Sequence, residues 1–389
     1  MKRVLRNTYY IVLIIIILSG NVTLASETNN EPKKLYAYSA LLMDKATGRV
    51  LYHKNGYEER AMASTTKIMT CILALESCKM DEIVTVSKEA SKAPKVKLYI
   101  RPEEQYYLGD LLHALMLISS NDVAVAIAEH IGGTCEAFCD MMTKKAKQLG
   151  AINTCFKTPN GLDSHVEGHQ TTAYDLALIT RYALNNETFM KIINTPSKNF
   201  NEIKSNRGFN ITNKNSFLNM YQGANGVKTG YTAKAGYCFV GSAKRDDLEL
   251  IAVVLASGWP SNKTYRWKDT RMLLDYGFNN FETKRVLESN KYICDTYVKK
   301  GIEKKIDILT SEDVSITLSK DEHVDILYVI QPNLIAPIEI GQNVGEAEIY
   351  IDGKMYCSVP LVSKTDVTKI NYKYVFNEVV DKFLLFDNK

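Results

Sequence analysis

The sequence has almost no net charge: 48 lysines and arginines stand against 44 aspartates and glutamates in 389 residues, a formal charge of +4. Its basic residues are scattered among acids, so it lacks the positive footprint of a nucleic-acid-binding protein, and we expect no nucleic-acid partner. It also lacks an internal repeat and a low-complexity tract. The hydrophobic fraction of 46% and the charged fraction of 24% indicate an ordinary globular protein.

No long apolar run suggests a membrane span. The N-terminal apolar run, Tyr9 to Leu18, is about half of the roughly 20 residues that cross a bilayer. It follows Lys2, Arg3 and Arg6 and precedes the small-residue stretch Thr23-Leu24-Ala25. We therefore interpret residues 1–25 as a cleavable export signal, with an N-terminal membrane anchor as the alternative. The remaining chain is too long for one typical core and predicts two domains.

The eight cysteines lack the close paired spacing of a zinc motif or a small disulfide scaffold. We therefore predict no metal site, while the sequence leaves disulfide pairing open. A buried free cysteine often serves only as a small hydrophobic residue.

Apolar patterns predict the elements of a first domain over residues 34–282. Residues 39–43 and 49–52 are typical of a β-hairpin, and the spacing of apolar residues after Ser64 predicts an amphipathic helix with Ser64 and Lys67 in its first turn. Two helical patterns between Leu108 and Ile131 meet at Ser119-Ser120-Asn121. Residues 237–242 and 248–255 indicate two antiparallel strands, with Lys228 on or at the edge of the first.

From about Val286 the pattern changes to short β-rich runs separated by Asp, Asn, Gly and Pro. We predict a small all-β domain over residues 286–370. A last segment, 371–389, has apolar residues at helical spacing and could form an amphipathic anchor for peripheral membrane contact. Its polar face is not basic, so a helix packed on the second domain is the alternative.

Three short polar motifs follow one another along the chain. Ser64-Thr65-Thr66-Lys67 is the only Ser-x-x-Lys, and Lys228-Thr229-Gly230 is the only Lys-Thr-Gly. Ser119-Ser120-Asn121 is weaker alone, because Ser-x-Asn also occurs at Ser19 and Ser197. Together they supply the polar groups of a serine acyl-transfer site.

The first motif pairs a candidate nucleophile, Ser64, with a candidate base, Lys67, because residues three apart on a helix share a face. An ordinary lysine, with a pKa near ~10.4, is protonated at neutral pH. Burial or a neighbouring positive charge such as Lys228 must therefore lower the pKa of Lys67. The alternative is a helix-capping serine beside a surface lysine.

The other two motifs supply the remaining roles. Ser119 can relay a proton to a leaving amine, and Asn121 can hold a substrate amide or the base. Lys228 and Thr229 can bind an anionic substrate end, and Gly230 lets a substrate backbone approach the strand edge.

These motifs resemble those of the penicillin-recognising serine acyl-transferases. Within that group the chain is most similar to the low-molecular-mass D-alanyl-D-alanine carboxypeptidases, on the stretches 158–163, 169–177 and 226–232. Residues 334–338 and 341–345 look like the small β-rich domain of those enzymes. The resemblance implies an α+β catalytic domain with a five-stranded antiparallel sheet flanked by helices.

By the same resemblance, Ser64 forms an acyl-enzyme with peptidoglycan stem peptides that end in D-Ala-D-Ala, and penicillin inhibits it covalently. The oxyanion hole would be the backbone N–H groups of Ser64 and Tyr231, and Arg266 is a second candidate for binding the terminal carboxylate. Ser120 stands where relatives often have Gly or Asp, which leaves it as a weaker alternative to Ser119. No cofactor is implied, and the enzyme is expected outside the cytoplasmic membrane or in the cell wall.

Two alternatives stay open. A class A β-lactamase uses a glutamate in a Glu-x-x-Leu-Asn stretch, but Arg181 stands where that glutamate would precede Leu184-Asn185, and Glu167 lacks the pattern. The appended β domain also argues against a β-lactamase. The second alternative is a wall-binding scaffold without turnover, which no sequence feature favours.

Overall fold

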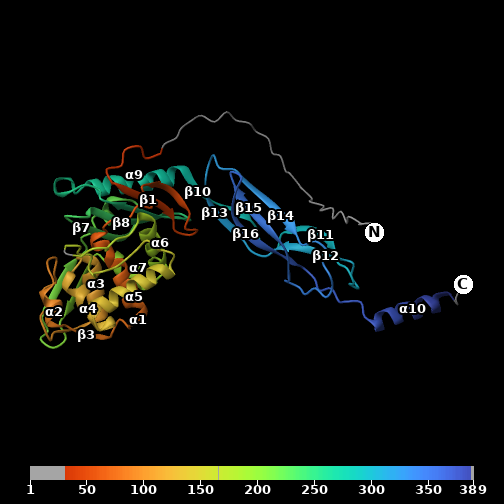
Figure 1. Ribbon diagram of the computed structural model, residues 1–389, viewed down its shortest axis with the longest axis horizontal. Coiled ribbons are helices and arrows are strands. Elements are labelled where there is room, and N and C mark those ends of the chain that lie inside the picture. Colours follow the sequence, from red (N-terminus) through yellow and green to blue (C-terminus); the bar gives the residue numbers. More distant parts are fainter. Residues whose placement is uncertain (1–30, 165, 387–389) are drawn as a thin grey trace, which may run out of the picture. The chain divides into compact units, whose positions relative to one another are not determined.

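A computed structural model describes residues 31–164 and 166–386. The chain divides into two compact units, with the boundary between Glu282 and Thr283 (Figure 1). The predicted export signal over residues 1–25 lies outside the described residues. All eight cysteines are free thiols. Among the described helices, none combines the length and the hydropathy that a membrane span requires.

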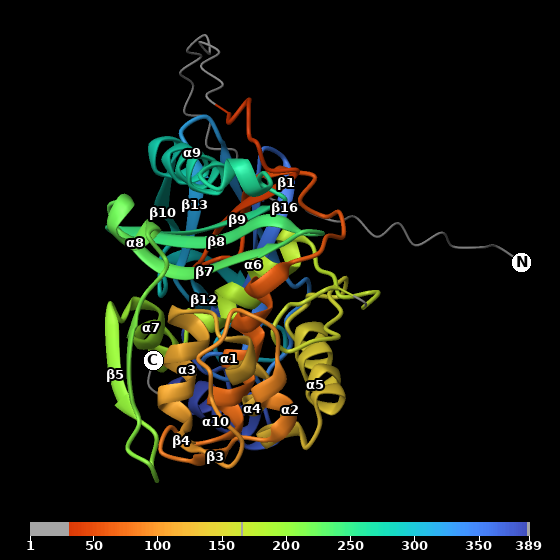
Figure 2. The same cartoon turned by 90° about the vertical axis from the view of Figure 1, so that its left-hand side faces the viewer.

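A five-stranded antiparallel sheet in the order β2-β1-β9-β8-β7 forms the centre of the larger unit (Figure 2). Its strands are β1 Ser39–Asp44, β2 Val50–Lys54, β7 Ala224–Thr232, β8 Gly236–Arg245 and β9 Leu248–Leu255. The predicted hairpin is β1 with β2, and the second predicted pair is β8 with β9. Asp246, in the turn between β8 and β9, has a φ of 49°, a conformation that aspartate tolerates well.

The position of Lys228 differs from our prediction. It lies on a strand of its own, β7, which pairs with β8 so that Lys228 is opposite Val240 and Gly230 is opposite Cys238. Our prediction did not separate this strand from the one near residue 237, because Gly226 and Gly230 interrupt its pattern and glycine is depleted in strands. Strand β7 forms the edge of the sheet, so one side of its backbone is not paired with another strand of this sheet.

Helices cover both faces of this sheet (Figure 2). Helix α9 (Tyr265–Asn280) packs on one face against β8, β9 and β1, and α6 (Ala173–Ala183) packs on the other against β9 and β1. The other helices are α1 Lys67–Ser77, α2 Lys88–Lys92, α3 Leu108–Leu117, α4 Asn121–Gly132, α5 Cys135–Gln148, α7 Glu187–Asn194 and α8 Phe217–Met220. Two short hairpins complete the unit, β3 (Ile83–Thr85) with β4 (Gln105–Tyr107) and β5 (Ser197–Asn201) with β6 (Gly208–Thr212).

The predicted helix after Ser64 is α1, and its face with Ile68, Cys71 and Ile72 is buried in the core. The α-helix begins only at Lys67, however. Ser64 lies just before it in a 3₁₀ turn, Ala63–Thr66, in which the hydroxyl of Thr66 donates to the carbonyl of Ala63. The predicted helix junction is confirmed, since α3 ends at Leu117 and α4 begins at Asn121.

The smaller unit is all β apart from its last helix, as predicted. Its strands are β10 Phe281–Leu287, which crosses the boundary, β11 Tyr292–Tyr297, β12 Lys305–Thr310, β13 Val314–Ser319, β14 Val324–Ile330, β15 Asn343–Ile351 and β16 Lys354–Ser363. They form one sheet in the order β11-β12-β16-β15-β14 and a pair of β10 with β13. Alternate residues such as Ile306 and Ile308 fill its core. Helix α10 (Tyr372–Phe386) follows.

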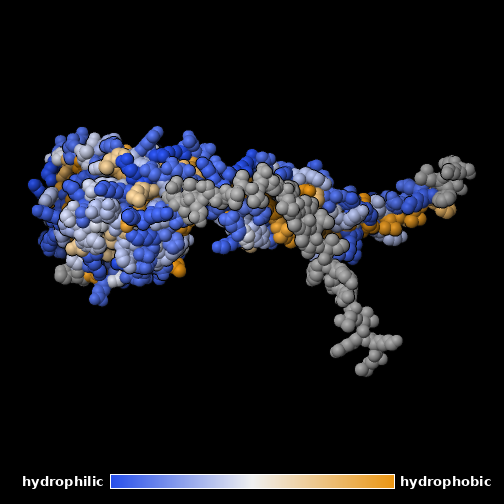
Figure 3. Space-filling view, turned by 90° about the horizontal axis from the view of Figure 1, so that it is seen from above, coloured by the Kyte–Doolittle hydropathy of each residue, from blue (hydrophilic) through white to orange (hydrophobic). Residues whose placement is uncertain are grey.

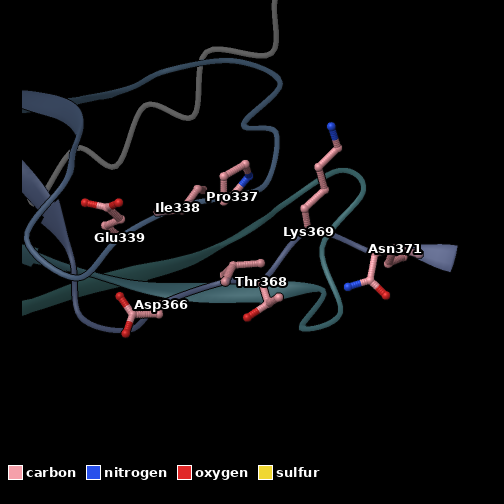
Figure 4. A pocket seen from close by; sticks show the side chains of 9 residues that line it. Pro337, Ile338, Glu339, Asp366, Thr368, Lys369 and Asn371 are labelled. Atoms are coloured by element: carbon pink, nitrogen blue, oxygen red, sulfur yellow. The ribbon is translucent and has the colours of Figure 1, made fainter. Parts of the chain in front are cut away.

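An open depression of about 790 Å³ lies on this β unit, between the segments Pro337–Glu339 and Asp366–Asn371 (Figure 4). It carries charges of both signs, and none of the candidate catalytic residues lines it. The site built from the three motifs belongs to the larger unit alone.

Candidate active site

Ser64, Lys67 and Asn121 come together at the start of α1 and α4. The Nζ of Lys67 lies 3.0 Å from Ser64 Oγ, 2.8 Å from Asn121 Oδ1 and 2.6 Å from the main-chain oxygen of Asn160. The oxygens of Asn121 and Asn160 can only accept, so they take two N–H groups of the amine. The third position on the nitrogen faces the Ser64 hydroxyl, and in a neutral amine that position is the lone pair.

The electrostatic surroundings favour a neutral Lys67. Burial holds the pKa of Lys67 well below its usual value, and the charge of Lys228 lowers this pKa further, while Asp122 opposes both effects. The side chain is fully buried. In the described residues no carboxylate hydrogen bonds to its amine. Lys67 can therefore accept a proton from Ser64 at a pH at which an exposed lysine could not.

Asn121 is itself held in place. Its Nδ2 donates to the carbonyls of Pro94 and Lys95 at 3.2 and 2.9 Å, which leaves Oδ1 facing Lys67. The next residue, Asp122, accepts the N–H groups of Leu98, Tyr99 and Ile100. The first residues of α4 thus fix the segment 94–100 beside the catalytic cluster.

The two serines of the middle motif have different environments. Ser119 is half-buried and has a φ of 63°, in the left-handed region, at the junction between α3 and α4. Ser120 is fully buried, and within the described residues its hydroxyl has no hydrogen-bond partner. Ser119 is therefore the more accessible of the two hydroxyls. Within the residues that the structure describes, it makes no hydrogen bond to Lys67 or Lys228.

Lys228 is buried in the middle of β7, with 2% of its surface exposed. Its Nζ donates to the carbonyl of Thr229 at 3.2 Å. Burial and the charges of Lys214 and Arg266 lower the pKa of Lys228 to about 7. A substrate carboxylate would restore its charge, because an opposite charge favours the protonated amine.

Gly230 brings β7 against the turn that carries Ser64. A Cβ at this position would lie 3.0 Å from both Ser64 N and Ala63 Cβ, tighter than ordinary side-chain contacts. On the other side, a Cβ at Gly161 would lie 1.9 Å from the carbonyl oxygen of Ala63, and Gly161 has a φ of +87°. The turn is held between two backbone segments, of which the one at Gly161 requires glycine and the one at Gly230 leaves little room for a larger residue.

Tyr231 and Arg266 lie at the outer part of the site. The side chain of Tyr231 is exposed, with its ring centroid 4.5 Å from that of Tyr237. The guanidinium of Arg266 lies over the rings of Tyr237 and Trp267, at 4.7 and 4.5 Å. Its Nε is buried without a hydrogen-bond partner in the described residues. The positive charge of Arg266 contributes to lowering the pKa of Lys228. The structure therefore brings all nine sequence-predicted residues to one region around Ser64 and β7.

Two parts of the chain match known protein families. Residues 25–258, more than half of the sequence, match the family model of D-alanyl-D-alanine carboxypeptidases. The chain belongs to the D-alanyl-D-alanine carboxypeptidase family. Residues 281–369 match a second family model, the C-terminal domain of penicillin-binding protein 5.

Similar carboxypeptidases cover nearly the whole chain. The D-alanyl-D-alanine carboxypeptidase DacF of Bacillus subtilis is 36% identical over 344 residues, covering 86% of this chain and 87% of its own length. DacC of Escherichia coli is 32% identical, with 88% and 87% covered. The crystal structure of penicillin binding protein 5 from Haemophilus influenzae is 30% identical and superposes with a TM-score of 0.74, covering 87% of this chain and 99% of that one. The protein is thus a carboxypeptidase of the penicillin-binding class.

Two residues of the carboxypeptidase site were not identified as site residues from the sequence. The carbonyl of Asn160 holds Lys67, and the charge of Lys214 lowers the pKa of Lys228. A backbone carbonyl leaves no signal in a sequence, although Asn160 lies in one of the stretches that carry the family resemblance. Lys214 is an exposed lysine like many others, and only the fold brings it to β7.

A third residue, His169, supports the turn that carries Ser64, the candidate nucleophile. Its Nδ1 accepts the N–H of Lys157 at 3.0 Å, so Nε2 carries the proton and donates to Thr66 Oγ1 at 2.9 Å. Burial, with the charges of Lys234 and Lys67, lowers the pKa of His169 to about 4. The histidine is neutral at pH 7 and holds the residue next to Lys67.

Proposed function

We propose that this carboxypeptidase is exported and removes the terminal D-alanine from peptidoglycan stem peptides through an acyl-enzyme on Ser64. The observation that carries the proposal is the buried amine of Lys67, 3.0 Å from Ser64 Oγ, with its other neighbours limited to oxygens that accept. This arrangement fits a general base, because among the described residues the serine hydroxyl is the hydrogen-bonding neighbour left for the lone pair.

In the acylation step, Ser64 Oγ attacks the carbonyl carbon of the penultimate D-alanine and its proton passes to Lys67. The C–N bond to the terminal D-alanine then breaks, and the leaving amine takes up a proton. Ser119 is the proposed relay for that proton, since its hydroxyl is the more accessible one at the head of α4. Water then hydrolyses the ester and restores the Ser64 hydroxyl.

The tetrahedral oxyanion would be stabilised by the backbone N–H groups of Ser64 and Tyr231. The close approach of Gly230 to Ser64 N supports this role, because it sets the backbone of β7 beside the turn of the nucleophile. One donor of this kind typically contributes about 10²–10³ in rate.

The carboxylate of the terminal D-alanine would bind Lys228 and Thr229, with Arg266 as a second cation. The lowered pKa of Lys228 supports this assignment. Lys214 and Arg266 are close enough to affect Lys228, and in the described part of the chain none of the three has a carboxylate partner, so together they attract an anion. The buried, unpartnered Nε of Arg266 adds a donor to the same region.

A penicillin would acylate Ser64 in the same way, and slow hydrolysis of that adduct would make it an inhibitor. A class A β-lactamase needs a further carboxylate to activate water. Arg181, at the position of that glutamate, instead donates to the carbonyls of Lys45 and Ala46 at 2.8 and 2.6 Å, and Glu167 is exposed. These contacts favour the carboxypeptidase over the β-lactamase, and the complete catalytic cluster disfavours an inactive scaffold.

Export would place the enzyme in the cell wall or at the outer face of the cytoplasmic membrane, where its substrate lies. Helix α10 supports peripheral contact with that membrane. Its apolar side chains gather along one face (Figure 3). The exposed apolar residues are Tyr372, Val375, Phe376, Val379, Phe383 and Leu384. Their exposure disfavours the alternative of a helix packed on the β unit.

The catalytic assignment is tested by D-alanine release from a peptide that ends in D-Ala-D-Ala. Ser64→Ala should abolish release, and Ser119→Ala should lower kcat by about 10²–10⁴. Ser120→Ala is the matched control and should retain activity within a fewfold of the wild type. If Ser120→Ala is the impaired variant and Ser119→Ala is not, the assignment within the middle motif is wrong.

The membrane proposal is tested by sedimentation with lipid vesicles. The chain without residues 1–25 should bind, and the chain that also lacks residues 371–389 should stay in solution. Binding should be similar for neutral and anionic vesicles, because Glu378 and Asp381 balance the basic residues of α10. Equal binding of the truncated chain would exclude α10 as the anchor.

A further inference from the structure

A second cluster of reactive side chains lies at the far ends of the two helices that carry the catalytic groups. Cys78 caps the C-terminus of α1, Glu82 follows it in the turn before β3, and His130 lies in the last turn of α4. One thiol sulfur, one carboxylate oxygen and one imidazole nitrogen from these residues all lie within 4.8 Å of one another. The proposed peptidase mechanism uses none of them.

The contacts in this cluster already draw the three side chains together. His130 Nε2 lies 2.8 Å from Glu82 Oε1. The Cys78 thiol hydrogen bonds to the same carboxylate. Burial raises the pKa of Cys78 to about 11, and the negative charge of Glu82 and this hydrogen bond add to the increase. The side chains of Glu82 and His130 remain open to solvent, with 41% and 24% exposed. An ion can therefore reach all three ligand atoms from outside.

We propose that Cys78, Glu82 and His130 form a site for a borderline divalent cation of the Zn²⁺ class. Thiolate, imidazole and carboxylate are the three ligand types that Zn²⁺ takes in proteins. Tetrahedral Zn²⁺ with bonds of 2.0–2.3 Å requires ligand atoms roughly 3.3–3.7 Å apart, so the His130–Glu82 contact opens by about half an ångström and the sulfur moves inward. On binding, the Cys78 thiol gives its proton to solvent and the ion takes its place beside the carboxylate.

The position of the site indicates what a bound ion would do. Helix α1 begins at Lys67 and α4 begins at Asn121, and these two side chains are joined by a hydrogen bond of 2.8 Å. A metal at the other ends would connect the two helices a second time. It would stabilise the larger unit without touching substrate, and the fourth coordination position would hold water.

Cysteine spacing did not predict this site. Cys78 and Glu82 are four residues apart, but His130 comes from a distant part of the chain, and no short motif joins them. Only the packing of α4 against α1 and β3 brings the imidazole to the turn.

The proposal is tested by metal titration of the chain without residues 1–25, freed of metal with a chelator. Co²⁺ serves as the spectroscopic probe, since a thiolate ligand gives a charge-transfer band in the near ultraviolet. One equivalent of Co²⁺ should produce the band, and Zn²⁺ should displace it. At about a hundredfold excess over its Kd, Zn²⁺ should raise the Tm by about 5 to 10 °C.

Variants then distinguish the site from adventitious binding. Cys78→Ser should abolish the band, and His130→Gln and the exposed Glu82→Gln should each weaken binding by more than about 100-fold. Cys155→Ser and His323→Gln are matched controls, because Cys155 is a half-buried thiol elsewhere and His323 forms a surface pair with Asp325. A band that persists in Cys78→Ser, that disappears in Cys155→Ser, or that never forms in the wild type would overturn the proposal. Glu82→Gln keeps the test valid if Cys78→Ser fails to fold.

Discussion

Removal of the amine of Lys67 is the sharpest perturbation of the proposed mechanism. Lys67→Met keeps most of the buried side-chain volume but takes away the only group that we expect to accept the Ser64 proton. General-base catalysis typically contributes about 10²–10⁴ in rate, which corresponds to about 2.7–5.5 kcal/mol in the barrier. The second-order rate of acylation by a labelled penicillin should fall by this factor.

Stability should change much less than the rate. The substitution leaves the buried Asn121 Oδ1 without the Lys67 donor, at a cost of about 1–3 kcal/mol, while the carbonyl of Asn160 loses its closer donor but keeps the Ser64 hydroxyl at 3.4 Å. It also removes a buried amine that has no carboxylate partner within residues 31–164 and 166–386, which offsets this cost. We therefore expect a folded protein, and thermal unfolding measures that directly.

A matched control is Lys145→Met, which removes a different lysine that contacts α1, through Glu76 at 2.8 Å. It should acylate within about twofold of the wild type. If Lys67→Met is folded and acylates within tenfold of the wild type while Ser64→Ala does not react, Lys67 is not the base and the reasoning fails.

Three further predictions follow from the geometry around β7. Gly230→Ala should lower acylation by more than about tenfold with little loss of Tm, because its Cβ would meet Ser64 N at 3.0 Å; an unchanged acylation rate would contradict this contact. Arg266→Gln should raise KM at least about tenfold for a peptide with a free terminal carboxylate but not for its amide, and equal effects on both would exclude carboxylate binding. The profile of kcat/KM against pH should rise as the Lys67 amine loses its proton and fall above about pH 7 as Lys228 loses its charge. Lys228→Arg should move the falling limb to higher pH, and an unchanged limb would assign it to another group.

The sequence predicted the side chains of the candidate site, because they stand in short motifs. It also predicted the helices and strands in which apolar residues recur at a regular spacing. Alternating and helical apolar patterns located the β1–β2 hairpin, α1 and the junction of α3 with α4. The motifs named Ser64 and Lys67 as partners, and the structure sets them 3.0 Å apart. The pattern worked here because the two residues are three apart, and the 3₁₀ turn with Ser64 leads directly into α1 at Lys67.

Features that depend on long-range packing could not be predicted. The sequence placed Lys228 on or at the edge of the strand near residue 237 and did not separate β7 from it, because Gly226 and Gly230 interrupt the strand pattern and only the pairing in the fold shows two strands. The position of the Asn160 carbonyl depends on how the segment after residue 157 folds over Ser64, and the approach of Lys214 to Lys228 depends on the path of β6 into β7. In the proposed metal site, His130 is likewise distant in sequence from Cys78 and Glu82.

The most direct test of the central claim is mass spectrometry of the chain without residues 1–25 after reaction with penicillin, combined with an assay of D-alanine release from a D-Ala-D-Ala peptide. We predict one long-lived adduct, located on Ser64, and release of D-alanine that penicillin blocks. An adduct on another residue, or D-alanine release that survives Ser64→Ala, would contradict the account.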